Sequence, residues 1–557
     1  MNQIKTIKPQ LGFSTIIDSL HSLRQFSMKS PKSLFKLKII KQFTQDDGFH
    51  NEKIKFHKLL QLSSSLKSLK YLDLSSSNTR KFKFSHLKLI LKKFYHIQRY
   101  SAPWKNKTNK GLVPAFLLIK NAKYLTNLSI EVSLNHLPRR LLYLLHLSKI
   151  KTLHLNQTSP SGDETEISVD LSKYLPLTLE NLDLRPYGPT ATKWRFPLSI
   201  KHLSNIKKLE LGIPLSLSDL EGIIRSIQDP KKLKSLRFNI KQEHDEEEGI
   251  SKEIRGFLRR CLNLEELNIK ATMADFYSET YSMAKLKRLV ILQTVKTSEC
   301  ILRLGEFIKQ QRENLESLSL KLTFDGMSDV NTDLNKFLGE FKPLRSLKKL
   351  VLNVGTKNLQ ITSSLTGLIE ALNYLEELDF ESVAIDFTEE SLDKFFKALL
   401  QKHSQSLKSL KLALNDCSCS NIIAQTVKRL PRLGDLTLEN FGIENGSNFY
   451  LDLREIVCYK NRGLNSVVLT NTKRHNKKKD GENVIKMLKD IIWKPTMKKF
   501  CYLEYWTPKL SDEFRGVPML KLDDVLKQVY HFKYLHLPTY TCEPSFYYWD
   551  LDVHKWK

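Results

Sequence analysis

The chain has 557 residues, of which 41% are hydrophobic and 27% are charged, and its formal net charge is +29. This length exceeds what one ordinary hydrophobic core can organise, so the sequence predicts several domains or an array of repeats. A mean hydropathy of −0.34 and the lack of any apolar run of about 18 residues argue for a soluble protein without a membrane span.

The positive charge is concentrated near the N-terminus. Residues 1–120 contain 24 Lys or Arg and 5 Asp or Glu, a balance of +19, whereas the remaining residues contain 65 and 55, a balance of +10. Two interpretations stay open. Lysine-rich faces of this kind are often simply solvated, or the N-terminal region binds an anionic partner such as a nucleic acid.

Residues 1–60 are predicted to form a basic, helical N-terminal cap, in which SLFKLKII (33–40) is a candidate degenerate first repeat. The N-terminus has neither a continuous apolar stretch nor a small-residue cleavage site, so no secretory signal is expected. The seven cysteines are scattered, and Cys417 and Cys419 lack the further ligands that a zinc site needs. We therefore expect reduced thiols in an intracellular, cytoplasmic protein, with a nuclear or organellar location left open.

One apolar spacing, L-x-x-L-x-x-L-x-L, recurs from residue 61 to residue 540. It is clear in LKSLKYLDL (66–74), LSKIKTLHL (147–155), LRSLKKLVL (344–352) and LNYLEELDF (372–380). The copies end at Leu74, Ile130, Leu155, Leu184, Leu211, Phe238, Ile269, Ile291, Leu320, Leu352, Phe380, Leu412, Leu438, Leu469 and Leu537, with weaker copies ending at Ala102 and Tyr502. These are 16 steps in 463 residues, a mean spacing near 29, which indicates a solenoid.

Each period contains a strand and a helix. The last letters of each copy alternate between apolar and variable residues, which is typical of a strand with one buried face. Between the copies, apolar residues recur at three- and four-residue steps, as they do in an amphipathic helix. Such stretches are LEGIIRSIQD (220–229), LNKFLGEFK (334–342), LDKFFKALLQKH (392–403) and NVIKMLKDIIWK (483–494). Because one unit cannot bury its apolar face alone, the units are predicted to stack.

This pattern resembles the leucine-rich-repeat superfamily, whose motif is L-x-x-L-x-L-x-x-N/C-x-L, and the long period is similar to its ribonuclease-inhibitor-like subclass. The resemblance implies an α/β solenoid, or horseshoe, of about 17 strand–helix repeats, with a parallel sheet on the concave face and helices on the convex face. One feature departs from the motif: its Asn site holds Asn only at position 415. Ser or Thr replaces it at Ser77, Ser133, Thr158, Thr272, Thr294, Thr323 and Thr472.

The outward strand positions of such an array are candidates for binding a partner. They are mixed in charge, which disfavours a nucleic-acid groove on the concave face. Five acidic residues, here called the acidic cluster, are predicted to bind basic residues of a protein partner: Glu377, Asp379, Glu381, Asp435 and Glu439. The alternative is a solvated face that Lys411, lying between them, partly neutralises.

The remaining charged stretches, 244–249 and 472–483, are predicted loops. Residues 541–557 hold Phe546, Tyr547, Tyr548, Trp549 and Trp556. The last repeat of an array leaves an apolar edge, so this segment is predicted to be an aromatic C-terminal cap. A tail that docks on another protein is the alternative.

No motif for nucleotide binding, metalloprotease, hydrolase or kinase chemistry is present, and His154 and His536 have no matched partner by spacing. We therefore expect a protein that is not an enzyme and needs no cofactor or metal. The sequence favours a scaffold or adaptor that binds a protein on its concave face. Two alternatives stay open: a nucleic-acid-associated protein, such as a ribonucleoprotein component, anchored by its basic N-terminal region, and a structural subunit of a large assembly.

Overall fold

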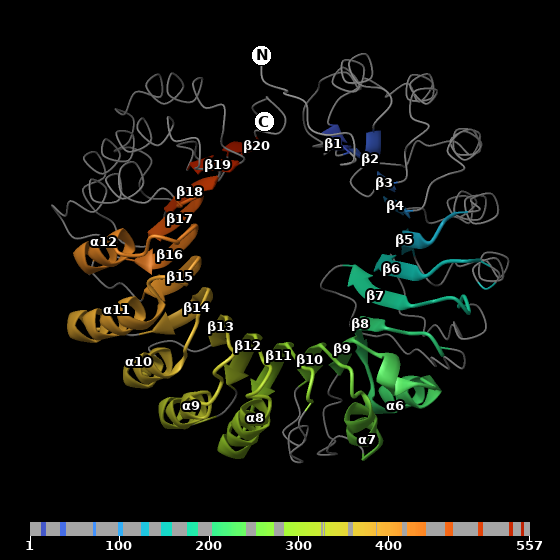
Figure 1. The fold of residues 1–557 in the computed structure, drawn as a ribbon, viewed down its shortest axis with the longest axis horizontal. Helices are drawn as coiled ribbons and strands as arrows, with labels where there is room; N and C mark the ends of the chain where they lie inside the picture. The colour runs from blue at the N-terminus through green and yellow to red at the C-terminus, as the bar shows by residue number, and fades with distance from the viewer. Residues whose placement is uncertain are drawn as a thin grey trace. The chain divides into compact units, whose positions relative to one another are not determined.

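The structure, a computed structural model, divides into two compact units, Met1–Leu264 and Glu265–Lys557, which are described separately. It describes residues 13–17, 34–39, 71–73, 99–103, 124–132, 146, 148–158, 175–187, 203–240, 252–271, 283–324, 327, 329–354, 360–385, 387–414, 420–441, 463–471, 499–504, 534–537 and 547–550. Each unit contains a sheet whose successive strands follow one another along the chain, with helices on one face of that sheet (Figure 1).

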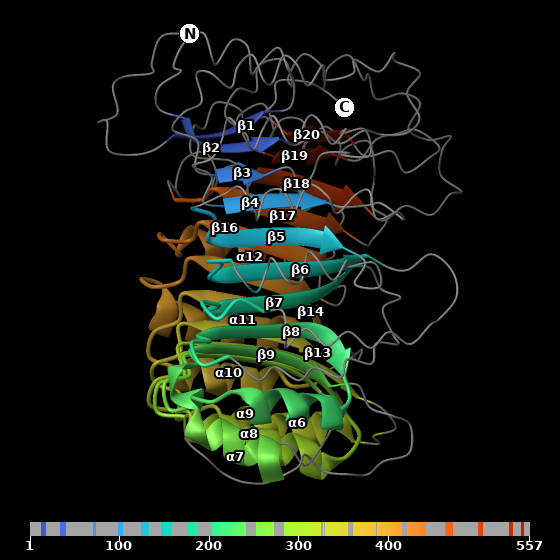
Figure 2. The same ribbon diagram turned by 90° about the vertical axis from the view of Figure 1, so that its right-hand side faces the viewer.

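The first unit is a ladder of parallel strands in chain order. Its strands are β1 (Phe13–Ile17), β2 (Leu34–Ile39), β3 (Tyr71–Asp73), β4 (Arg99–Pro103), β5 (Asn127–Val132), β6 (Thr152–Thr158), β7 (Asn181–Tyr187), β8 (Lys208–Leu215) and β9 (Ser235–Ile240). Each pairs in parallel with the next, and Figure 2 shows β5–β9 stacked as successive rungs. Its described helices are α6 (Leu217–Ser226), the short 3-10 helix η5 (Pro230–Lys232) and α7 (Lys252–Arg260).

The second unit repeats this plan. Its strands are β10 (Glu266–Ala271), β11 (Arg288–Val295), β12 (Ser317–Phe324), β13 (Lys349–Val354), β14 (Glu377–Ile385), β15 (Ser409–Leu414), β16 (Asp435–Phe441), β17 (Ser466–Asn471), β18 (Lys499–Glu504), β19 (Tyr534–Leu537) and β20 (Tyr547–Asp550). The ladder from β10 to β19 is parallel. The described helices are α8 (Ser298–Gln310), α9 (Val330–Gly339), α10 (Thr362–Ala371), α11 (Glu389–His403) and α12 (Ser420–Lys428).

The predicted repeat is confirmed strand by strand. All 17 predicted markers fall inside β3–β19 or, at Leu74, directly after the strand. Strand and helix alternate through the described repeats from β8 to β9 and from β11 to β16. The chain therefore has an α/β solenoid fold of the leucine-rich-repeat kind.

Strands also occur in the two predicted caps. β2 coincides with the candidate degenerate repeat at 33–40, and β1, which the sequence did not suggest, pairs in parallel with it. In the aromatic tail, β20 pairs antiparallel with β19. The other residues of 1–60 and 541–557 lie outside the described part of the chain, so the helical N-terminal cap and the aromatic C-terminal cap stay predictions.

The core of each unit is built from the apolar letters of the repeat. In the second unit one row of aligned residues runs through Leu267, Leu289, Leu318, Leu350, Leu378, Leu410, Leu436 and Val467, and each is at most 1% exposed. Because the period of a strand is two residues, this register places every alternate side chain against the helices. The residues between them form the opposite face.

The helices cover the apolar face of the sheet. Predicted helices at 220–229, 334–342 and 392–403 are confirmed as α6, α9 and α11, whereas 483–494 lies outside the described residues. α11 begins with a capping box, in which Thr388 and Ser391 each bond the other's backbone, and this arrangement satisfies amides that a helix start leaves open. α11 then buries Leu392, Phe395, Phe396 and Leu399.

One set of side-chain hydrogen bonds between repeats lies on the turn that precedes the strands. Five residues, each three positions before a strand, donate to a backbone carbonyl of the preceding repeat at 2.7–2.9 Å. The bonds run from Thr178 to Ile150, from Asn263 to Lys231, from Asn314 to Ala284, from Ser346 to Glu313 and from Ser406 to Leu375. These bonds, here called the turn ladder, join neighbouring repeats. At the motif's own position, the Thr294 and Thr323 hydroxyls lie 3.0 Å apart.

Candidate partner-binding face

The first, third and fifth residues of the strands form a face that the helices leave open, here called the concave face. In both units the helices lie on the other side of the sheet (Figure 1). On β11, Leu289, Ile291 and Gln293 are buried, whereas Arg288, Val290 and Leu292 are exposed or half-buried. Alternation along the strand therefore separates a core face from a face available to solvent or to a partner.

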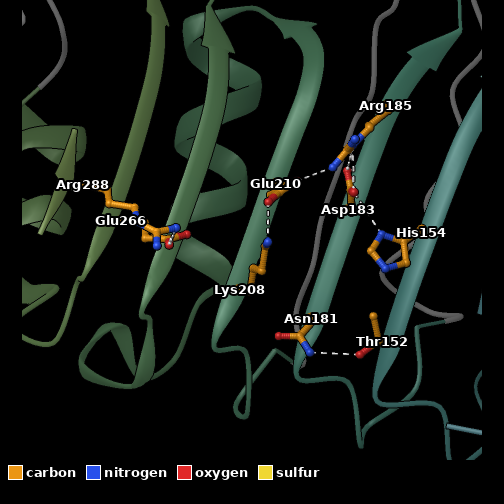
Figure 3. Close-up of polar contacts among 9 residues, drawn as sticks. All are labelled: Thr152, His154, Asn181, Asp183, Arg185, Lys208, Glu210, Glu266 and Arg288. Atoms are coloured by element: carbon orange, nitrogen blue, oxygen red, sulfur yellow. Dashed lines mark hydrogen bonds and ion pairs between the residues drawn. The ribbon is translucent and has the colours of Figure 1, made fainter. Parts of the chain in front are cut away.

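Five polar residues of β6, β7 and β8 form a network on the concave face of the first unit (Figure 3). His154 donates from Nδ1 to Oδ2 of Asp183 at 2.9 Å. Nε of Arg185 lies 2.9 and 2.8 Å from the two carboxylate oxygens of Asp183, and its Nη2 donates to Glu210 at 2.9 Å. Lys208 completes the network: its Nζ lies 2.6 Å from Oε1 of Glu210. The charges of these strands thus neutralise one another across repeats.

The buried member of this network is Asp183, which is 4% exposed. Burial by itself raises the pKa of a carboxyl group, but hydrogen bonds from His154 and Arg185, together with the positive charge of Arg185, outweigh it and hold the pKa of Asp183 below its ordinary value. The hydrogen bond to Asp183, against some desolvation, raises the pKa of Arg185. Both groups are therefore charged at neutral pH.

The partner of His154 corrects the sequence analysis, which found none by spacing. Asp183 lies 29 residues after His154, one repeat period away, at the same place on the next strand. A search at one-period offsets along the outward positions would have found this pair.

Ser129, His154 and Asp183 stand opposite one another on three neighbouring strands. A Ser–His–Asp relay requires the serine hydroxyl within hydrogen-bond reach of the histidine. In the described part of the chain, no hydrogen bond joins Ser129 to His154. The row is therefore a polar network rather than an assembled relay.

Two described members of the acidic cluster pair with lysines in the second unit. Glu377 on β14 bonds Lys349 on β13, and Asp379 lies 3.0 Å from Lys411 on β15. Asp435 aligns with Glu377 two strands away, through Ser409. The side chains of the other two members, Glu381 and Glu439, lie outside the described residues. The structure thus places the cluster on β14 and β16, with Lys411 of β15 between them.

The concave face of the second unit carries no net charge. The first, third and fifth residues of β10–β18 include six bases and six acids. The bases are Lys270, Arg288, Lys321, Lys349, Lys411 and Lys499, and the acids are Glu266, Glu377, Asp379, Glu381, Asp435 and Glu439. The excess of +29 in the whole chain therefore lies elsewhere, which disfavours a nucleic-acid groove along these strands.

Two lysines of this face differ from the other described bases. Arg288 donates to Glu266 at 2.8 Å, as Figure 3 also shows, and Lys349 and Lys411 bond carboxylates of the acidic cluster. Lys270 and Lys321 are exposed, and within the described residues neither makes an ion pair. Among the described side chains on the concave face of the second unit, unpaired positive charge therefore occurs only on β10 and β12.

Several predicted features lie outside the described residues. These are most of the basic region 1–120, the charged loops 244–249 and 472–483, and Cys417 and Cys419. In the described part, no group of three or more His, Cys, Asp or Glu side chains is placed to hold a metal ion. Among the described helices, none has the length and apolarity that crossing a bilayer requires.

Two comparisons with known proteins found no match: no protein-family model matches the chain, and no curated protein does. Among solved structures it is similar to the leucine-rich repeat-containing protein LegL7 from Legionella pneumophila, at 11% identity over 93% of this chain and 97% of that chain, with a TM-score of 0.14. Because that score is low, the fold assignment depends on the strand ladder and the helices described above.

Proposed function

We propose that the chain is a non-catalytic scaffold that binds a protein partner on its concave face. The observation that carries this proposal is the contrast between the two faces of each sheet. One face is covered by the described helices α6 to α12, whereas the other holds polar and charged side chains in register and, in the described part of the chain, carries no covering layer (Figure 1). Extended surfaces of this kind are what solenoids offer to other macromolecules.

The size of the face supports a macromolecular partner rather than a small ligand. Neighbouring strands are about 4.8 Å apart, so the ten parallel strands of the second unit span on the order of 40 Å. A small metabolite binds in a concave, mostly apolar pocket. A row of exposed side chains on a sheet fits the flatter surface of a protein instead.

Two finer assignments belong to the same proposal. The helices between strands, of 9 to 15 residues in the second unit, support the long-period, ribonuclease-inhibitor-like subclass. Cys261 and Cys300 are free and buried, and burial raises the pKa of the Cys261 thiol to about 12. Inert, reduced thiols of this kind support the intracellular location predicted from the sequence.

The proposal is tested by site-specific photo-crosslinking in cells. A photoreactive amino acid replaces Ser235 on β9, Ser317 on β12 or, as the control, Gln401, which is exposed on α11. We expect the same protein to be crosslinked from the strand positions and not from Gln401, as identified by mass spectrometry. Crosslinking from the helix position alone would place the partner on the other face and contradict the proposal.

The acidic cluster is tested separately, as one candidate receptor site on this face. In Glu377→Lys with Glu381→Lys, a basic partner segment meets like charge, which costs affinity. Retention of every partner that co-purifies with the wild-type chain would remove the cluster from the proposal and leave the rest of the face.

A further inference from the structure

Aliphatic side chains gather on one part of the concave face in the second unit. Val290 and Leu292 on β11 and Val351 on β13 are half-buried at outward positions. Ser319 on β12 aligns with both valines, so a small residue lies between them. On β5–β9 of the first unit, the first, third and fifth residues include no alanine, valine, leucine or isoleucine. The apolar patch is therefore a local feature rather than a property of every repeat.

The two unpaired lysines flank this patch. Lys270 aligns with Leu292, and Leu292 aligns with Lys321 on the following strand. The neighbouring acids are already bonded, Glu266 to Arg288 and Glu377 to Lys349. The charge left open beside the aliphatic residues is therefore positive.

We propose that Lys270, Val290, Leu292, Lys321 and Val351, here called the β10–β13 strip, bind an acidic segment of a protein partner that also carries apolar side chains. This inference rests on the proposed function and narrows it to one site and one partner chemistry. It differs from the prediction made from the sequence, which expected a basic partner on the acidic cluster.

The geometry of the strip defines what it binds. Lys270 and Lys321 are two strands apart, about 10 Å at the usual strand spacing, so each ammonium group can meet a different carboxylate of one segment. Leu292 lies between them and, with Val290 and Val351, offers apolar area to a leucine, valine or aromatic side chain. Burying that area supplies affinity, whereas the lysines favour acidic over basic partners.

The surroundings favour a protein segment over a nucleic acid. The carboxylates of Glu266 and Glu377 stand on the same face and would repel a phosphate backbone. Lysine is a point charge, without the planar fork with which arginine grips phosphate, and the strip contains no aromatic ring on which a base could stack.

The test uses the purified full chain and labelled probes at physiological salt. Fluorescence anisotropy compares a short peptide of alternating leucine and aspartate with a peptide in which serine replaces leucine. Because both peptides carry the same charge, the comparison separates apolar contact from general attraction to a basic protein. We expect the leucine peptide to bind roughly tenfold more tightly than the serine peptide, the gain that burial of a few apolar groups gives.

Matched variants locate the binding site. Lys270→Glu with Lys321→Glu is compared with Lys342→Glu and Lys402→Glu, which make the same change in charge on the turn after α9 and near the end of α11. We expect the first variant to lose about tenfold or more in affinity, as like-charge contact does, and the second less than about twofold. Leu292→Ser is expected to weaken binding of the leucine peptide but not binding of the serine peptide. Val468→Ser, an outward valine on β17, serves as its control.

Equal losses of affinity in the two double Lys→Glu variants would overturn the inference. Equal affinity of the wild-type chain for the leucine and serine peptides would overturn it as well. A labelled single-stranded RNA that binds in place of the peptides and is lost in Lys270→Glu with Lys321→Glu would assign the strip to nucleic acid. Failure of the peptide test together with photo-crosslinking of a partner at Ser235 or Ser317 would leave the proposed function in place and remove only this site. If crosslinking fails as well, the scaffold proposal fails too.

Discussion

His154 on β6 donates a hydrogen bond from Nδ1 to the carboxylate of Asp183 on β7, 2.9 Å away and one repeat later in the chain. The same carboxylate accepts from Arg185. Asp183 is 4% exposed, although it stands on the face that is otherwise open to solvent. His154 and Arg185 thus both bond the buried carboxylate of Asp183. A charge that is hydrogen-bonded in this way can be buried at a low cost in free energy.

Asp183→Asn is expected to destabilise the first unit. An amide in this position cannot satisfy both donors with full charge, and one broken bond of this kind costs about 1–3 kcal/mol. The measurement is hydrogen exchange of the backbone amides in β6 and β7, because stability in a repeat array is largely local. Lys208→Met, which removes a half-buried member of the same network, is the control, and a loss of stability as large as that of Asp183→Asn would show that burial of Asp183 is not what matters.

The same residue gives the first unit a dependence on acidic pH. Because the folded pKa of Asp183 is lowered, its contribution to stability is complete above the ordinary carboxyl pKa of about 3.9. It is lost as the pH falls below that value and through the folded pKa. We expect this acid-side loss to be smaller in Asp183→Asn than in the wild-type chain, as measured by the free energy of unfolding against pH. Parallel curves would show that other groups dominate the acid transition.

The strands could be predicted from the sequence, but the ion pairs between side chains of neighbouring strands on the concave face could not. Markers such as Leu320 and Leu412 could be predicted because apolar residues alternate within each copy of the repeat, and burial enforces that alternation. The bond between Lys349 and Glu377 depends instead on which residues of two strands lie opposite each other, a property of register 28 residues apart in the chain. β1 was missed because FSTII lacks the nine-letter spacing of the later repeats.

The same limit explains why the sequence favoured the acidic cluster. Counting charges at outward positions showed several acids close together, with Lys411 between them as a partial neutraliser, but it did not show that Glu377 bonds Lys349. Conversely, Lys270 and Lys321 resembled any other lysine until their neighbours were known. Whether a charge is open to a partner depends on the side chains around it, so the structure was needed to separate the two groups.

A buried histidine is expected to make the second unit sensitive to mild acid. His403, at the end of α11, is 0% exposed. Its Nδ1 accepts the Leu375 amide at 3.2 Å, and its Nε2 donates to the Ile369 carbonyl at 3.0 Å. This pattern fits only the neutral ring. Burial, opposed by the hydrogen bond to Ile369 and assisted by the charge of Lys402, lowers the pKa of His403 below 6.5.

The sign of the effect follows from that direction. Below pH 6.5 the unfolded chain binds a proton at this histidine before the folded chain does, so stability falls as the pH drops from 6.5 to the folded pKa. His403→Gln is expected to remove this dependence, because an amide does not titrate in this range. A glutamine is already accommodated at the equivalent place after α8, where Gln311 accepts from the Met283 amide at 2.8 Å and donates to the carbonyl of Phe307 on its own helix at 3.1 Å. Unfolding measured at pH 7.5 and 5.5 in both proteins tests this, and an equal loss in the two would contradict it.

The turn ladder is expected to contribute stability at each interface between repeats. Asn314→Ala removes the 2.7 Å bond to the carbonyl of Ala284, and a net loss of about 1 kcal/mol follows from the usual worth of such a bond. Ser346→Ala should cost a similar amount, because its bond to Glu313 is of the same kind, at 2.9 Å. Urea denaturation gives the change in free energy of unfolding. An unchanged midpoint in both variants would mean that water replaces these donors without loss.

Lys270 and Lys321 are expected to be dispensable for folding. Both are exposed, and in the described part of the chain neither bonds a carboxylate, so Lys270→Ala with Lys321→Ala should change the free energy of unfolding by less than about 0.5 kcal/mol. Lys411→Ala is the comparison, because it removes the ion pair that Asp379, which is 21% exposed, makes at 3.0 Å, and weakening the bonding of a half-buried charge is destabilising. The two variants are compared by urea denaturation at pH 7. A large loss in the double variant would mean that these lysines support the fold, and weaker binding of the leucine–aspartate peptide to that variant could then no longer be assigned to contact with the peptide.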